Sequence, residues 1–254
     1  MSAAEFPGRL LVESAPRDGR WNMAFDEALL EAAANRGETT LRIYRWSQPT
    51  LSLGHFQKSL PPDLPASLRD VPCVRRLSGG GAILHHYEWT YSVAVPKGHP
   101  LAARTEALYD AAHEAITASL VNLGVTVALR KEADRAADLN FLCFLRGDPR
   151  DVLAAGRKVV GSAQRRRRGA VLQHGSVVLR RSELAPDVPG LAELVAGVPD
   201  DPLWAAAGFV EELGRRLFAA NPIQLANETD IAFADRRMSS ESRNDRIEGQ
   251  ITCL

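Results

Sequence analysis

The chain has 254 residues, and its 31 Lys and Arg residues balance 31 Asp and Glu residues, which argues against a dedicated nucleic-acid-binding protein. Apolar residues make up 45% of the chain and charged residues 24%, as in soluble globular proteins with a sizeable core, and no apolar run is long enough to span a membrane. The three cysteines argue against a disulfide framework, and without a visible secretory signal the chain is expected to be cytoplasmic.

The first half of the chain is predicted to contain one helix followed by several strands. Asn22 is expected to cap a helix over residues 23–34 that ends near Gly37. Strands are predicted where β-branched and aromatic residues cluster, over residues 39–46, 50–53 and 71–77. Between them, residues 61–69 are predicted to form a loop and a short helix.

The clearest strand covers residues 89–95, where large and small side chains alternate. We expect residues 82–85 to pair with this strand across a turn near residues 86–88. Leucine and alanine residues at helical spacing predict a helix over residues 101–123, with Gly124 at its C-terminal cap.

The second half of the chain is predicted to contain further strands and two helices. Strands are expected over residues 125–129 and 170–179, with a hairpin over 152–160 that turns at Ala155-Gly156. Helices are expected over residues 191–196 and 202–220, followed by a polar tail of poor order from about Asn227. Such clustered, partly hairpin-connected strands indicate an α+β fold with a mixed, mainly antiparallel sheet flanked by helices.

The segment RRLSGGGAILH, residues 75–85, is the first candidate for a binding site. Three consecutive glycines allow positive φ angles, and their exposed N–H groups can bind an anion or a carbonyl oxygen. A flexible turn between two strands fits the same residues. The segment lacks the Walker and Rossmann glycine spacings, which excludes those two nucleotide-binding motifs.

The segment GRKVVGSAQ, residues 156–164, places Lys158 inside an apolar strand. Burial disfavours the charged form of a lysine, so a buried Lys158 is suited to act as a base or to bind a carbonyl group. The alternative is an exposed strand lysine. The arginine run that follows is either a solvated loop or a docking patch for an acidic partner, and RNA binding lacks an aromatic pattern to support it. This run comprises Arg165, Arg166, Arg167 and Arg168.

Cys143, between Leu142 and Phe144, is the candidate nucleophile. Cysteine is a strong nucleophile once deprotonated, and a nearby lysine can supply the base or the electric field that this requires. Cys143 precedes Lys158 by 15 residues, a separation that permits contact without requiring it. A buried structural cysteine fits the same stretch. The histidines show no metal-ligand spacing, so no metal site is predicted. A Ser-His-Asp triad stays open as an alternative, without a G-x-S-x-G motif to support it.

Four segments together resemble the catalytic domain shared by biotin and lipoate protein ligases and octanoyltransferases. In the family's order they are NMAFDEA (22–28), RRLSGGGAILH with EWTYS (75–85 and 88–92), GRKVVGSAQ (156–164) and LQHGS (172–176). The resemblance implies a class II synthetase-like α+β catalytic domain, which we expect over residues 1–226, with residues 227–254 as the tail.

The resemblance also implies transfer of an octanoyl group to a lysine of a lipoyl domain or glycine cleavage H protein. Lys158 would hold the acyl carbonyl, and one transferase branch carries its catalytic cysteine in a Cys-Phe pair, as at Cys143-Phe144. The expected acyl-pocket residues are Arg76, Ser78, Gly79, Gly80, Gly81, His85, Gly161, Ser162, Ala163 and His174.

Two chemistries compete within this family. Lipoate ligases activate free lipoate with ATP, whereas octanoyltransferases take octanoate from acyl carrier protein through a cysteine thioester and need no cofactor. The Cys143-Phe144 pair, and a tail too short for the accessory domain of bacterial ligases, favour the octanoyltransferase. The alternatives are an ATP- and Mg-dependent lipoate ligase, an amidotransferase between lipoyl-domain proteins, a non-catalytic acyl-carrier-binding protein and, more distantly, a biotin ligase. No nucleic acid or membrane is expected among the partners.

Overall fold

A computed structural model describes residues 8–134, 140–218 and 224–225. The helices are α1 (Gly19–Arg36), α2 (Thr105–Asn122), α3 (Leu191–Leu194) and α4 (Ala206–Phe218), with 3₁₀ turns η2 (Ala66–Leu68), η3 (Pro100–Ala102) and η5 (Cys143–Leu145). The strands are β1 (Gly8–Val12), β2 (Thr39–Tyr44), β3 (Thr50–Leu53), β4 (Cys73–Arg75), β5 (Ile83–His85), β6 (Glu88–Val95), β7 (Val127–Leu129), β8 (Val152–Ala154), β9 (Arg157–Arg167), β10 (Ala170–Val178) and β11 (Gln224–Leu225). None of the described helices is long and apolar enough to cross a membrane.

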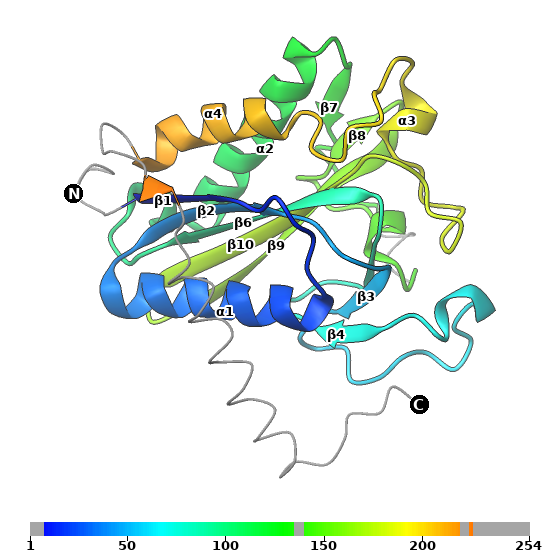
Figure 1. Cartoon of the computed structure of the whole chain (residues 1–254), viewed down its shortest axis with the longest axis horizontal. Coiled ribbons are helices and arrows are strands. Elements are labelled where there is room, and N and C mark those ends of the chain that lie inside the picture. The colour runs from blue at the N-terminus through cyan, green and yellow to red at the C-terminus, as the bar shows by residue number, and fades with distance from the viewer. Residues whose placement is uncertain (1–7, 135–139, 219–223, 226–254) are drawn as a thin grey trace.

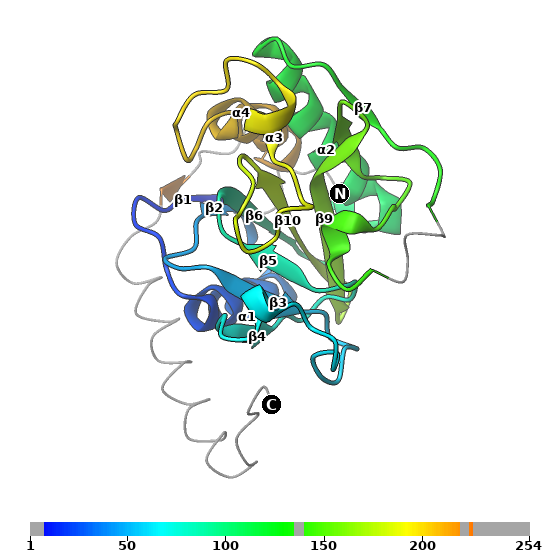
Figure 2. The ribbon, with the colours of Figure 1, turned by 90° about the vertical axis from the view of Figure 1, so that its right-hand side faces the viewer.

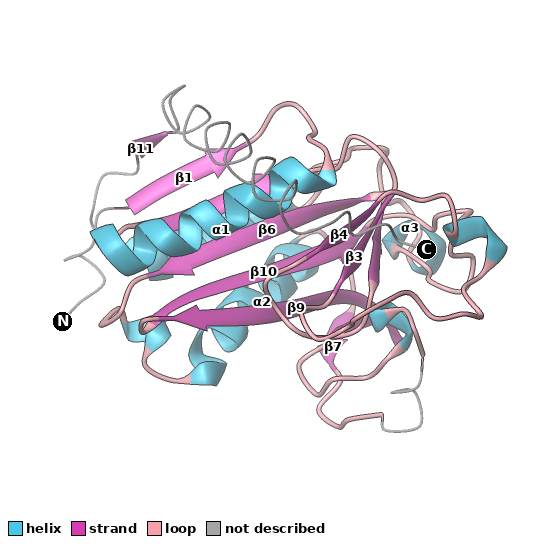
Figure 3. Ribbon diagram, turned by 90° about the horizontal axis from the view of Figure 1, so that it is seen from below, coloured by secondary structure: helices cyan, strands magenta, loops and turns pink. Residues whose placement is uncertain are grey.

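The described strands form two sheets. The larger has eight strands in the order β11-β1-β2-β6-β10-β9-β8-β7, and the smaller has the order β4-β3-β5. Within the large sheet β1 runs parallel to β2 and β11, and the other neighbours are antiparallel. Helix α1 covers one face, and α2 and α4 cover the other (Figures 1 and 3). This is the mixed, mainly antiparallel α+β fold that the sequence predicted.

Strand β6 separates an apolar core from the polar face that carries the site. The rings of Trp89 and Tyr91 pack on Phe209 of α4, with centroids 5.4 and 4.9 Å apart. On the opposite face Ser92 donates a hydrogen bond of 2.6 Å to Asp26 of α1. The alternation along β6 therefore directs its large side chains under α2 and α4, and its small polar ones toward α1 and the small sheet, which lie on the same side (Figure 2).

Helix α1 begins earlier than predicted, and Asn22 is not its cap. The helix is capped by Asp18, whose carboxylate accepts a hydrogen bond of 2.9 Å from the backbone N–H of Trp21. Asn22 is fully buried within the helix, and its Oδ1 accepts a hydrogen bond of 2.7 Å from Arg42. Asp18 offers the same capping chemistry one turn earlier, while the buried guanidinium needs an acceptor at Asn22. The predicted end at Gly37 is confirmed by its φ of 71°.

The predicted pairing of residues 82–85 with β6 is wrong. Strand β5 pairs instead with β3 in the small sheet, where His85 lies opposite Thr50. Both edges of β6 are already occupied, by β2 and β10. Proximity along the chain therefore did not identify the partner, because the turn after β5 carries the chain from one sheet into the other.

The remaining predicted elements are present, several of them shorter than expected. Helix α2 lies within the predicted range 101–123, and the hairpin between β8 and β9 turns at Ala155 and Gly156, with φ angles of 46° and 74°. Strand β4 is shorter than 71–77, α3 is shorter than 191–196, and α4 begins four residues after the predicted start of 202–220. The predicted tail, residues 227–254, lies outside the described residues.

Candidate active site

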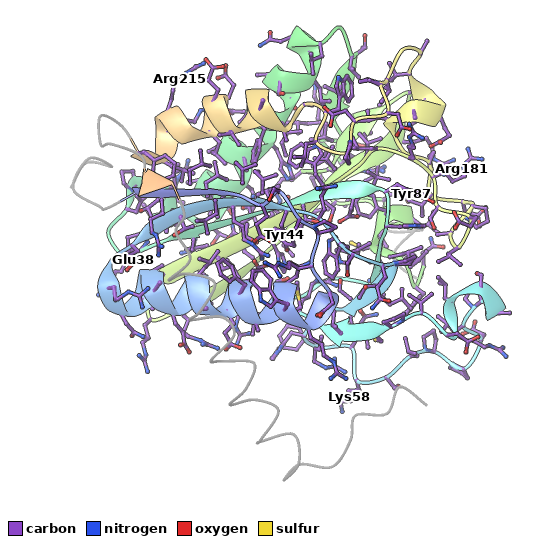
Figure 4. All side chains as sticks on the ribbon, viewed as in Figure 1. Glu38, Tyr44, Lys58, Tyr87, Arg181 and Arg215 are labelled. Carbon is purple, nitrogen blue, oxygen red and sulfur yellow. The ribbon has the colours of Figure 1, made fainter. Side chains whose placement is uncertain are left out.

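A cavity lies between the α1 face of the large sheet and the small sheet, with about 490 Å³ of empty space when its solvent-open part is included. Nine of the residues predicted for the site line it: Arg76, Gly79, Gly80, His85, Cys143, Gly161, Ser162, Ala163 and His174. Ser78, Gly81 and Lys158 do not line this cavity, although each contacts residues that do. Sequence analysis missed Met23, Tyr44 and Trp46, because apolar and aromatic residues in a helix and a strand have the same pattern as a core. Figure 4 places Tyr44 in the interior of the molecule.

Cys143 and Lys158 meet beside the cavity. The amide of Cys143 donates to the carbonyl of Ala82 at 2.7 Å. This bond ties the turn η5 to residues 78–82, here called the glycine segment. Lys158 Nζ lies 3.8 Å from Cys143 Sγ and donates a hydrogen bond of 3.2 Å to the Cys143 carbonyl. At this distance a neutral Lys158 amine can take the Cys143 proton, and the ammonium that results stabilises the thiolate.

A β-bulge in β9 directs Lys158 toward Cys143. Lys158 pairs with Leu153, but Val160 pairs with the adjacent Val152, so one extra residue is inserted in β9. Bulges re-aim side chains in this way near functional sites. The space beside Gly161 is then filled by Lys158, since a Cβ at Gly161 would lie 2.6 Å from Lys158 Cε.

Asp151, which sequence analysis missed, holds the other side of the Lys158 ammonium. Its Oδ1 lies 2.8 Å from Lys158 Nζ, and the two side chains are only 3% and 4% exposed. Oδ2 accepts a hydrogen bond of 2.8 Å from the amide of Asp148. Burial raises the pKa of Asp151, and the charge of Lys158 opposes the shift only in part. The ammonium is therefore held between a carboxylate and a thiol rather than moving freely.

Arg76 shapes the glycine segment from beneath. Its guanidinium donates to the carbonyls of Ser52, Gly79 and Gly81 at 2.8, 2.7 and 2.7 Å. Burial lowers the pKa of Arg76 to about 10, with charge on Cys143 opposing the shift. Gly80 adopts a φ of 96°, which favours glycine. Arg76 therefore acts as a clamp on the loop, with most of its donors already used.

His85 forms one wall of the cavity. Its Nδ1 donates to Glu88 Oε1 and its Nε2 accepts from Ser52 Oγ, both at 2.7 Å. The indole of Trp46 stacks on the ring with centroids 3.8 Å apart. Burial lowers the pKa of His85, against the opposing effect of Glu88. Held in this way, the neutral imidazole of His85 forms a fixed, flat part of the cavity wall.

Ser78, His174 and Asp26 are connected like a Ser-His-Asp arrangement, but the serine is not at the cavity. Ser78 Oγ lies 2.5 Å from His174 Nε2, and Asp26 Oδ2 lies 3.1 Å from His174 Nδ1. Burial alone would raise the pKa of Asp26, but its hydrogen bond with His174 and the charge of Arg42 lower it below the ordinary value. The arrangement therefore anchors the glycine segment to α1 and β10.

His113 supports the opposite side of the site. Its Nδ1 donates to the Arg150 carbonyl at 2.6 Å, and its Nε2 accepts from Ser162 Oγ at 2.7 Å. Burial lowers the pKa of His113 to about 4, and the charge of nearby Lys158 contributes. Because His113 is neutral, the Ser162 hydroxyl donates to it and accepts in turn from Tyr91, which lies 2.7 Å away.

The arginine run lies at the far end of the β9–β10 hairpin. Arg165 follows the cavity-lining Ala163 by two residues of extended strand, or about 7 Å, and Arg167 follows it by four, or about 13 Å. Three of the four guanidiniums bond to this chain: Arg166 to the carbonyls of Ala102 and Arg104, Arg167 to Glu27 and Glu31, and Arg168 to Asn35. None of the four arginines lines the cavity, although the run begins two residues beyond Ala163, which does.

A family profile and curated proteins that match this chain both come from the lipoylation enzymes. The family profile described as Lipoyl protein ligase A/B catalytic domain matches residues 18–185. The octanoyltransferase LipM of Moorella thermoacetica is 39% identical over 220 residues, which are 82% of this chain and 80% of that protein. The octanoyltransferase LipM of Symbiobacterium thermophilum is 37% identical over 241 residues, covering 88% and 83%.

Solved structures share the fold. A lipoate-protein ligase A bound with ATP superimposes with a TM-score of 0.67 at 21% identity, covering 91% of this chain and 94% of that one. A bi-partite lipoate protein ligase from Thermoplasma acidophilum gives 0.65 at 20% identity, covering 91% of each chain. At these identities the likeness establishes the architecture alone.

Proposed function

The chain belongs to the lipoyl protein ligase A/B catalytic domain family, and on that premise we propose that it is an octanoyltransferase working through a thioester on Cys143. The observation that carries this proposal is the 3.8 Å approach of Lys158 Nζ to Cys143 Sγ beside a cavity with apolar walls. The octanoyltransferase relatives, matched over most of the chain, support it. The thioester donor is octanoyl-acyl carrier protein. The acceptor is a lysine on a lipoyl domain or H protein.

The first half-reaction moves the acyl group to the enzyme. Lys158, in its neutral amine form, takes the Cys143 proton and becomes an ammonium, and the thiolate attacks the carbonyl carbon of the donor thioester. The Lys158 ammonium stabilises the oxyanion that forms. Collapse breaks the donor C–S bond, and the departing thiolate takes up the proton, leaving an octanoyl thioester on Cys143.

The second half-reaction moves the acyl group to the acceptor. A neutral lysine amine attacks the thioester carbon, a C–N bond forms and the C–S bond to Cys143 breaks. The amine gives up one proton, which Lys158 or the Cys143 thiolate receives. A thioester is converted to an amide, which is downhill, so this route needs no ATP.

The acyl chain would occupy the cavity along the α1 face. Met23, Trp46 and Ile83 supply apolar wall for the chain. The proposal therefore places the reactive carbonyl at Cys143 and the tail toward β2.

Intact-mass measurement of the protein mixed with octanoyl-acyl carrier protein, without ATP, tests the proposal. We expect an octanoyl adduct that hydroxylamine removes and that the Cys143→Ala variant lacks. Cys73→Ala is the matched control and should keep the adduct, because Cys73 lies in β4 away from Lys158. No adduct, with AMP formed from ATP and lipoate instead, would make the protein a ligase.

A further inference from the structure

An unusually exposed aromatic side chain stands beside the glycine segment. Phe56 is 80% exposed, more than any other large apolar side chain among the described residues. It lies in the turn after β3, residues 54–58, here called the Phe56 loop. Single exposed apolar residues are common, so exposure alone carries no argument.

The Phe56 loop is held firmly, so the exposure does not result from a loose segment. The amide of His55 donates to the Ser78 carbonyl at 2.8 Å, and the amide of Gly54 donates to the Gln57 side chain at 2.9 Å. The Arg75 guanidinium donates to the carbonyls of Gln57 and Lys58. A loop whose backbone is already fixed loses little conformational entropy when a partner covers it.

The loop adjoins the cavity. A Cβ at Gly79 would lie 3.7 Å from the Phe56 ring, and Gly79 lines the cavity together with Cys143. Arg146, three residues after Cys143, lies against Gly81 at the other end of the glycine segment. A partner resting on Phe56 would therefore lie next to the nucleophile.

Basic residues predominate in the segments that meet here, although the whole chain has as many acidic as basic residues. Segments 54–62, 75–86 and 140–147 carry Lys58, Arg75, Arg76 and Arg146 and contain no Asp or Glu, while Asp63 and Asp148 directly follow two of them. No ion pair joins any of these four cations to a carboxylate within residues 8–134 and 140–218. Figure 4 shows Lys58 on the outside of the molecule near β4.

We propose that the Phe56 loop, flanked by Lys58 and Arg146, is the docking surface for a small acidic protein that carries the acyl group as a thioester. This proposal rests on the octanoyltransferase function, because docking there would deliver the thioester to Cys143. Phe56 supplies an aromatic anchor, and the unpaired cations steer and orient an acidic partner. The arginine run at residues 165–168 is the competing surface; it begins two residues beyond the cavity-lining Ala163, and three of its four guanidiniums are bonded within the chain.

Acylation of Cys143 by two donors that share the same acyl group tests the proposal. One donor is octanoyl-acyl carrier protein and the other is octanoyl-pantetheine, which has no protein surface. Phe56→Ser should lower kcat/KM roughly tenfold with the carrier protein and leave it unchanged with the pantetheine thioester. Lys58→Glu should have the same selectivity, and its effect should shrink as salt is raised.

Two variants serve as controls. Val121→Ser removes a side chain that is 52% exposed on α2, and Arg168→Glu reverses a charge in the competing arginine run. Neither should change the ratio of the two donors. A loss with Arg168→Glu but not with Phe56→Ser would overturn the proposal in favour of the arginine run.

Three further outcomes are also decisive. An equal loss with both donors in Phe56→Ser would mean that the loop shapes the acyl pocket, and would overturn the docking proposal. If Phe56→Ser is acylated normally but passes the octanoyl group to the acceptor more slowly, the Phe56 loop would be the acceptor surface. That result would also overturn the docking proposal. Failure of the unaltered protein to react with either donor would contradict the proposed function itself.

Discussion

The carboxylate of Asp151 lies 2.8 Å from the ammonium of Lys158, and both side chains are almost completely buried. The same ammonium is 3.8 Å from the Cys143 sulfur. Because a buried ion has few alternative partners, this ion pair determines where the cation stands relative to the nucleophile. Asp151 is thus a positioning residue, acting on the reaction through Lys158.

Replacing Asp151 by Asn should destabilise the protein by about 3–5 kcal/mol, because it leaves a buried ammonium without its counter-charge. Adding Lys158→Met should recover part of that loss, since the double variant no longer buries an unpaired charge. Urea unfolding of the two single variants, the double variant and the unaltered protein measures the coupling. Strictly additive losses would show that the two side chains do not stabilise each other.

Gly161→Ala should impair acylation while leaving the fold intact. The new Cβ would lie 2.6 Å from Lys158 Cε and 3.0 Å from its Nζ, so the flexible end of the lysine must move away. Displacing the ammonium by about 1 Å should slow acylation of Cys143 by about 10- to 100-fold, at a stability change within about 1 kcal/mol.

Gly214→Ala in α4 is the control for this substitution. A Cβ there meets Phe218 only at 3.8 Å, an ordinary contact. Acylation should be unchanged and stability should rise by about 0.5–1 kcal/mol, as expected for Gly→Ala within a helix. Normal acylation kinetics in Gly161→Ala would show that the position of the lysine is not critical.

Ser78→Ala should retain the octanoyl adduct on Cys143. The serine is bonded to His174 and does not line the cavity, so its loss removes an anchor rather than a nucleophile. We expect a stability loss of about 1–3 kcal/mol, because His174 Nε2 loses its partner. Mass measurement with hydroxylamine treatment checks this. A hydroxylamine-resistant octanoyl ester in the Cys143→Ala variant would instead identify a serine nucleophile.

His113 should make the protein less stable as pH falls from neutral. Its pKa is lowered from 6.5 to about 4 in the folded state, so between these values the unfolded chain binds a proton that the folded protein lacks. Stability therefore falls as pH drops through this window, by up to about 3 kcal/mol from this group. His113→Gln removes the titration and should flatten the dependence of unfolding free energy on pH between 6.5 and 4. An identical slope in both proteins would contradict the assignment.

Much of the architecture was predictable because its signals are local. The alternation along residues 89–95 predicted which side chains of β6 share a face, and the Ala155-Gly156 turn predicted the β8–β9 hairpin. The cap of α1 was misplaced because Asp18 and Asn22 have similar local chemistry, and only burial against Arg42 distinguishes them. The pairing of β5 was mispredicted because strand partners are decided by which sheet edges are free.

By itself, the sequence determined the family, the mixed sheet and the two chemical groups of the proposed reaction, Cys143 and Lys158. Motif residues and periodicity involve a few neighbouring residues, so they can be recognised from the sequence alone. Only the tertiary structure decided that these two side chains meet, that Asp151 holds the lysine, and that most of the arginine run at residues 165–168 is bonded within the chain. Each of these depends on a strand bulge or on register between segments distant along the chain, and packing of the whole sheet sets both.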